Sequence, residues 1–206
     1  MKTIASLLKL SVLTLLILMS SGCKTYMYFK YGFTQPKEEN PEKLFAFLEK
    51  RHFPCNNQYL FTDSSAYTKA IRNPLFRKYL FNHLIFRRDG TLLQRDTTQC
   101  QWSGYDKIAS LDPDSTYDEC NDLKLNQILQ NIQSFGKNLY QNDVLSEPDF
   151  TIVVTWAKFL GTYNSRLFVL SEAVNLNQKS RIRLIWLNTD MQESWKLTKD
   201  QKLTLK

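Results

Sequence analysis

Histidine, glycine and proline are scarce in this 206-residue chain, which has two histidines, six glycines and six prolines. So few glycines and prolines exclude collagen-like and low-complexity architectures. The two histidines, His52 and His83, leave few arrangements for histidine-based nucleophilic or metal chemistry. The motifs G-x-G-x-x-G, G-x-S-x-G and H-E-x-x-H are missing as well, which argues against dinucleotide binding, serine hydrolysis and zinc peptidase activity. We therefore expect neither a metal nor a cofactor.

Cysteine is too rare for a small disulfide-built domain, because the chain has only four and no C-x-x-C pair. The 43% hydrophobic and 13% aromatic content is sufficient for a sizeable core. A formal charge of +7, from 27 basic and 20 acidic residues, is low for a dedicated nucleic-acid binder. The basic residues are also scattered in small clusters, so we expect no nucleic-acid partner.

The first 22 residues have the layout of an export signal. Lys2 and Lys9 precede an apolar run over residues 10–19, which is roughly half of the ~20 residues that a membrane-spanning helix needs. Small residues then lead to Cys23. We therefore expect residues 1–22 to be removed rather than retained in a membrane.

The sequence Ser21-Gly22-Cys23 resembles the end of a bacterial lipoprotein signal, although Ser20 stands where that family usually has leucine. The resemblance implies that Cys23 receives a diacylglycerol and becomes the N-terminus. In an ordinary secretory signal this cysteine would be incidental. Two acyl chains hold a protein stably on a bilayer, which implies a location in the bacterial cell envelope. Lys24 differs from the acidic inner-membrane retention signal, and this favours the outer membrane, facing the periplasm.

Residues 23–40 lack sustained helical or strand periodicity and contain Gly32 and Pro36, so we interpret them as a lipidated tether. Their aromatic side chains either rest at the lipid interface or pack on the folded part. A single α/β domain is expected over residues 41–206.

Periodicity and turn residues predict the elements of this domain. Asn40 and Pro41 are a helix cap and first-turn pair. Asp89-Gly90 favours a type I′ hairpin turn, in which both central residues need positive φ. The expected strands are residues 58–62, 83–88, 91–95, 150–156 and 181–187, and the expected helices are residues 41–53, 64–71, 74–80, 103–111, 115–140, 165–176 and 191–196. The segment 150–187 is a βαβ unit, whose strands should be parallel.

An alternating polar run precedes the expected long helix and consists of Asp112, Asp114, Thr116 and Asp118. The spacing is similar to a calcium-binding loop, but Tyr117 stands where such a loop needs glycine and Leu123 where it needs glutamate. We therefore interpret the acidic residues as caps of the helix at 115–140, whose dipole favours negative charge.

Three cysteines remain if a lipid occupies Cys23, namely Cys55, Cys100 and Cys120. In an oxidising compartment we expect one disulfide and one free thiol, and three pairings are possible. A bond between Cys55 and Cys100 would connect the first strand with the segment after the hairpin. The functional alternative is a redox pair, although catalytic thiols usually lie close together at the start of a helix.

The segments 151–161 and 182–190 are similar to the core of the thioredoxin-like family. In that family a hydrophobic strand ends in tryptophan, a C-x-x-C pair follows at the start of a helix, and the next parallel strand ends near aspartate. Trp156 keeps its place here, but Ala157 and Leu160 stand where the two cysteines would be.

The hairpin at 83–95 and the helix after Trp102 resemble the closing ββα unit of the same family, which here precedes the βαβ unit. The resemblance implies a thioredoxin-like, three-layer α/β fold with a mixed sheet, with the ββα unit in the N-terminal half and the βαβ unit in the C-terminal half. Either the units are permuted within one sheet or the N-terminal half forms a separate layer. An unrelated α/β sandwich is the alternative.

Without the two cysteines, the resemblance implies a redox-inactive domain with no catalytic residues. We therefore expect a lipid-anchored module that binds or scaffolds an envelope protein. Its partner groove would consist of Trp156, Lys158, Phe159 and Tyr163, unless the aromatic members pack in the core. Two alternatives stay open: a thiol-disulfide oxidoreductase with non-standard cysteines, or a purely structural lipoprotein.

Overall fold

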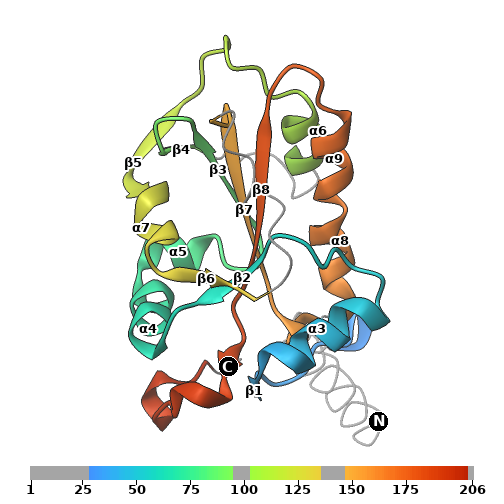
Figure 1. The fold of residues 1–206 in the computed structure, drawn as a ribbon, viewed down its shortest axis with the longest axis vertical. Helices are drawn as coiled ribbons and strands as arrows, with labels where there is room; N and C mark the ends of the chain where they lie inside the picture. The colour runs from blue at the N-terminus through green and yellow to red at the C-terminus, as the bar shows by residue number, and fades with distance from the viewer. Residues whose placement is uncertain (1–27, 95–102, 136–146, 204–206) are drawn as a thin grey trace, which may run out of the picture.

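The computed structural model describes residues 28–94, 103–135 and 147–203 of the chain (Figure 1). The strands are β1 (Glu38–Glu39), β2 (Gln58–Phe61), β3 (His83–Arg87), β4 (Thr91–Leu93), β5 (Glu119–Lys124), β6 (Ile132–Ser134), β7 (Phe150–Trp156), β8 (Ile182–Asn188) and β9 (Met191–Gln192). The α-helices are α3 (Pro41–Lys50), α4 (Ser64–Arg72), α5 (Pro74–Lys78), α6 (Ser103–Ala109), α7 (Leu125–Leu129), α8 (Asn164–Phe168) and α9 (Leu170–Leu176). The 3₁₀ turns are η1 (Lys158–Tyr163), η2 (Glu193–Trp195) and η3 (Lys199–Gln201).

Seven strands form one mixed sheet in the order β5-β4-β3-β7-β8-β2-β6. The central strands β7, β8 and β2 are parallel, whereas β3 is antiparallel to both β4 and β7. The expected parallel pair is confirmed, with Phe150 opposite Ile182 and Trp156 opposite Asn188. The hairpin in the N-terminal half joins the same sheet, because β3 pairs with β7 along its whole length.

The sheet forms the middle of three layers, as expected for an α/β fold. All seven residues of β7 are buried, and alternate side chains face opposite cores. Ile152 and Val154 pack in one core with α6, α8 and α9, whereas Val153 packs in the other with α4, α5 and α7. Figure 1 shows the two sets of helices on opposite sides of the sheet.

Two local predictions concern caps and turns. The side chain of Asn40 accepts a hydrogen bond from the backbone N–H of Lys43 (2.9 Å), so the predicted cap of α3 is confirmed. The hairpin turn is different from the prediction, because Gly90 has positive φ (+80°) but Asp89 does not. The Gly90 N–H donates to the Arg87 carbonyl (2.9 Å), which gives a three-residue loop instead of a type I′ turn.

The helix expected over residues 115–140 is wrong within the described residues. That segment instead forms β5, the short helix α7 and β6. Strands β5 and β6 cover the two outer neighbours β4 and β2, whose edges would otherwise have unpaired backbone groups. Tertiary pairing therefore outweighs the helical spacing of the apolar residues.

Two further helices differ from their predictions. The helix expected over 165–176 is split into α8 and α9, and the one expected over 191–196 is the strand β9 followed by the turn η2.

None of the helices in the described ranges combines the length and apolar composition that crossing a bilayer requires.

Residues 28–39, which we call the N-terminal segment, fold against the domain instead of extending from it. They include a helical turn at 28–31 and β1, which pairs in parallel with β9. The folded unit therefore extends further toward the N-terminus than the expected 41–206. Cys23 and the expected export signal lie outside the described residues.

Candidate functional site

The predicted partner groove lies where β7 ends. Trp156 is the last residue of β7, and Lys158, Phe159 and Tyr163 belong to η1, which follows directly. Trp156 is fully buried, and Phe159 and Tyr163 are also buried. The expectation of an exposed groove is therefore corrected for these three aromatic residues, which pack in the core. Lys158 alone remains partly exposed, with 33% of its side chain accessible.

The N-terminal segment covers Phe159 and Tyr163, whereas Trp156 packs against Phe47 of α3 and Phe168 of α8. Tyr31 is buried and packs edge-on against Tyr163, with ring centroids 5.3 Å apart, and Phe33 packs edge-on against the same ring at 6.0 Å. The Thr34 N–H donates to the Phe159 carbonyl (2.9 Å), so the backbone of the segment is also held. The chain thus fills its own predicted groove.

Gly161 allows the N-terminal segment to lie close to η1. Its backbone has φ +54° and ψ −128°, a combination that side chains with a Cβ avoid. A Cβ at this position would lie 2.2 Å from the carbonyl oxygen of Tyr31 and 2.6 Å from that of Gly32. Glycine is therefore required both by the local backbone and by the segment above it.

A buried carboxyl group lies at the adjoining end of β8. Asp190 is 2% exposed, and its Oδ2 accepts hydrogen bonds from the Lys158 backbone N–H (2.6 Å) and from Nδ2 of Asn188 (2.8 Å). Burial raises the pKa of Asp190 to about 7, although these hydrogen bonds oppose the rise. Because β7 and β8 are parallel, their carboxyl ends meet, and Asp190 links the two turns that follow them.

An ion pair connects this cluster to the N-terminal segment. Nζ of Lys158 lies 2.7 Å from Oε2 of Glu39, a residue of β1 that is itself buried. The buried side-chain atoms without a hydrogen-bond partner in the described part of the chain include Tyr67 Oη and Gln192 Oε1. Burial is also the largest cause that raises the pKa of Tyr67. We call Glu39, Lys158, Asn188 and Asp190 the polar clamp.

The polar clamp is suited to holding chain segments together and not to catalysis. A general acid or base must reach its substrate, whereas Asp190 is almost completely enclosed. Ala157 and Leu160, which follow β7, are fully buried and offer no nucleophile. Among the described residues, no group of three or more His, Cys, Asp or Glu side chains is placed to hold a metal ion.

The described cysteines lie on opposite sides of the sheet. Cys55 packs against the core that contains Trp156, whereas Cys120 packs against the core that contains Val153, and both thiols are free. Burial raises the pKa of Cys55, which lowers its thiolate fraction and its reactivity. The predicted partner of Cys55, Cys100, lies outside the described residues.

A small pocket borders the covered groove, between the start of β3 and helices α6 and α8. Asn82, His83, Tyr105 and Arg166 are among its lining residues, and its volume of ≈ 50 Å³ corresponds to a few water molecules. The Arg166 guanidinium lies 4.8 Å from the ring centroid of Tyr31, so the pocket also adjoins the N-terminal segment. The pocket is too small for a typical cofactor.

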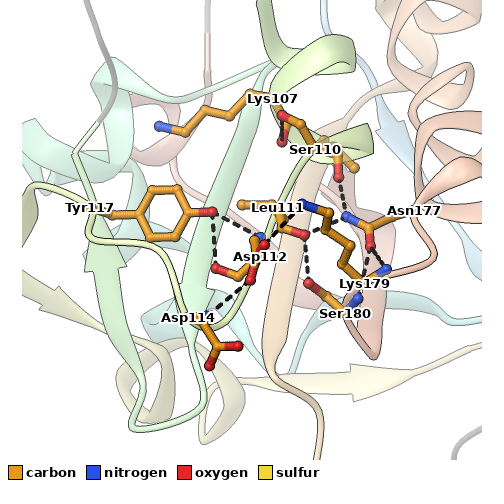
Figure 2. Close-up of polar contacts among 10 residues, drawn as sticks. Lys107, Ser110, Leu111, Asp112, Asp114, Tyr117, Asn177, Lys179 and Ser180 are labelled. Atoms are coloured by element: carbon orange, nitrogen blue, oxygen red, sulfur yellow. Dashed lines mark hydrogen bonds and ion pairs between the residues drawn. The ribbon is translucent and has the colours of Figure 1, made fainter.

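The acidic run does not precede a long helix, and its first residue instead takes part in a loop contact at the other end of the sheet. Oδ1 of Asp112 accepts a hydrogen bond from the Asp114 N–H (3.1 Å), and its Oδ2 lies 3.0 Å from Lys179 Nζ (Figure 2). Asn177 joins the two loops, because its Nδ2 donates to the carbonyl oxygens of Ile108 and Leu111 (2.9 Å each). This cluster is a structural connection between the loop after α6 and the turn after α9.

The sequence predicts that Trp156 and Lys158 lie at the end of the sheet where β7 and β8 finish, but it does not predict the polar clamp. The available signal was the pair of parallel strands, because polar residues that follow two such strands meet at one edge. Glu39 had no comparable signal, since it lies in a segment without periodicity.

Comparisons of the chain with protein-family models, with curated proteins and with solved structures give no match.

Proposed function

We propose that this chain is a lipoprotein of the bacterial envelope whose thioredoxin-like, redox-inactive domain works as a binding or scaffold module. The sequence up to Cys23 supports the lipid anchor. The observation that carries the proposed module is the covered end of β7, where Ala157 and Leu160 replace reactive cysteines and the N-terminal segment fills the groove.

Strand order supports the thioredoxin-like part of the proposal. Strands β4-β3-β7-β8 combine a parallel pair joined by helices with an antiparallel hairpin beside its first strand. This arrangement is compatible with the βαβ and ββα units that the resemblance implies, placed side by side in one sheet and in reversed order along the chain. The permuted arrangement is therefore favoured over a separate N-terminal layer.

The covered groove favours a scaffold over an oxidoreductase. The N-terminal segment, which begins five residues after Cys23, is held by aromatic contacts, by β1 and by the Lys158–Glu39 ion pair. A lipid on Cys23 would therefore hold the folded body close to the bilayer. An envelope protein that binds the module would contact its remaining surfaces, which include the mouth of the pocket lined by His83 and Arg166.

Lipid attachment is tested by growing cells with labelled palmitate. We expect the full chain to incorporate the label, Cys23→Ala to abolish incorporation, and the matched variant Cys120→Ala to leave it unchanged. An unlabelled wild-type chain, or label that survives Cys23→Ala, would contradict the lipoprotein assignment.

Redox activity is tested by insulin reduction with the purified chain. We expect no turnover above background, because no cysteine follows β7 and Cys55 has a raised pKa. Turnover that Cys100→Ser abolishes would instead establish the oxidoreductase alternative.

Partner binding is tested by photo-crosslinking in intact cells, with p-benzoylphenylalanine in place of Val169 at the pocket and, as a control, in place of Leu129 on the opposite helical layer. A defined envelope-protein adduct from position 169 alone supports the binding module. A folded, lipidated chain without adducts supports a purely structural lipoprotein.

A further inference from the structure

One aromatic side chain in the N-terminal segment faces solvent. Among the described residues, the large hydrophobic side chains with marked exposure are Phe29 (86%), Leu176 (60%) and Leu129 (37%). Phe29 is the most exposed of the three and belongs to the first described helical turn, at 28–31. An aromatic ring left almost entirely in water indicates a contact with something outside the domain.

The orientation of Phe29 follows from the contacts of its neighbours. Tyr31 is buried against Tyr163, and its carbonyl oxygen accepts a hydrogen bond from the Thr162 hydroxyl (3.1 Å). The Gly32 N–H donates to the Tyr28 carbonyl (2.9 Å), which closes the helical turn. Residues two apart on a helix point in nearly opposite directions, so Phe29 faces away from the domain because Tyr31 faces toward it.

The distance from Phe29 to the proposed lipid is short. Phe29 is the sixth residue after Cys23, and even a fully extended chain of that length spans only about 20 Å. Lys30 is exposed next to Phe29, and Lys24 follows Cys23 directly in the sequence. Aromatic rings partition to the bilayer interface, and lysines near an anionic leaflet are attracted to its headgroups.

We propose that Phe29 and Lys30 form a membrane-contact surface, in which the Phe29 ring enters the leaflet that holds the lipid of Cys23 and Lys30 contacts the headgroups. This inference rests on the proposed lipid anchor. Two points of attachment, the lipid and the ring, restrict the orientations that the domain can take. The carboxyl ends of β7 and β8 then face the membrane, and the C-terminal end of α9, at the opposite end of the molecule in Figure 1, points away from it.

Tryptophan scanning in lipidated protein tests this surface. Phe29→Trp and Leu176→Trp place an added indole at two exposed positions, of which only the first lies in the proposed contact. Each full-length chain is reconstituted in vesicles that contain brominated phosphatidylglycerol, and its fluorescence is compared with that of the wild type in the same vesicles. We expect bromine to quench most of the added emission of Phe29→Trp and little of that of Leu176→Trp.

Lipid on Cys23 is measured by mass spectrometry on the same samples, which separates the two proposals. A chain without lipid refutes the anchor itself. A lipidated Phe29→Trp chain that is quenched no more than Leu176→Trp refutes only the membrane-contact surface. Both replaced side chains are exposed, so the domain is expected to keep its fold, which far-UV circular dichroism verifies.

Discussion

The carboxyl group of Asp190 offers a quantitative test of the polar clamp. The variant Asp190→Asn keeps the size of the side chain and retains an oxygen that can accept from the Lys158 N–H and from Asn188. It removes the ability to ionise and replaces the other oxygen with an NH2 group, which does not titrate in this pH range. Any difference in pH dependence between wild type and variant therefore reports on this one group.

The expected size follows from the pKa of Asp190, which burial raises from 3.8 to about 7. Each unit of pKa difference between the folded and unfolded chain corresponds to about 1.4 kcal/mol, so ionisation of the folded protein costs up to about 4 kcal/mol. Between pH 4 and 7 the folded chain keeps a proton that the unfolded chain has released. The free energy of unfolding therefore falls as the pH rises through this window and is level again above it.

Urea unfolding at several pH values from 5 to 8 measures the effect. We expect the wild type to lose about 3 kcal/mol of stability over this range relative to Asp190→Asn, a figure that follows from two pH units of the shift. The matched control Asp200→Asn, at an exposed position of η3, should keep the wild-type pH dependence. Equal pH dependence in wild type and Asp190→Asn would refute the assignment of Asp190 as a buried acid.

Three further substitutions test other contacts. Gly161→Ala, which places a Cβ against the Tyr31 carbonyl, should cost about 1–3 kcal/mol and raise hydrogen exchange in residues 28–39; unchanged exchange there would contradict the close approach. Asn177→Ala removes hydrogen bonds between two loops and should lower the free energy of unfolding by about 2–4 kcal/mol in urea titrations, whereas a loss below 0.5 kcal/mol would show that the loops do not depend on it. Gly104→Ala puts a Cβ 2.3 Å from the His83 ring, so a lower melting temperature is expected, and no change would mean that the ring moves freely.

The central part of the fold could be predicted from the sequence because its residues carry local signals. The segments FTIVVTW and IRLIWL combine β-branched and aromatic residues over the length of a buried strand, and they are β7 and β8. The Asp89-Gly90 pair correctly predicted a hairpin, but the turn type differs because Asp89 does not have positive φ.

The edges of the sheet could not be predicted in the same way. Leu125 and Ile128 have helical spacing and do lie on a helix, but that helix is short because the flanking residues pair with β4 and β2. Such pairing depends on partners that are distant in the sequence. Periodicity within a window carries no information about them.

The candidate site likewise has features that the sequence shows directly and features that depend on contacts between distant residues. The absence of a C-x-x-C pair after β7 is visible in the sequence, whereas the polar clamp depends on a contact between Glu39 and Lys158, which are 119 residues apart. Burial of Phe159 and Tyr163 under the N-terminal segment, and of Trp156 under Phe47 of α3, also depends on long-range contacts. For these residues the sequence could not distinguish an exposed groove from a covered one.

The pairing of β1 with β9 has a consequence for how the protein matures. Glu38 pairs with Met191, and Lys43 bonds to Glu193, 150 residues further along the chain. A ribosome synthesises the chain from the N-terminus, so β1 must wait for nearly the whole chain before its partner strand exists. Until then the backbone edge of β1 has no strand to pair with and is accessible to chaperones and to other chains. Pairing of β1 is thus a late step, and a chain cut short before β9 would lack this strand pair.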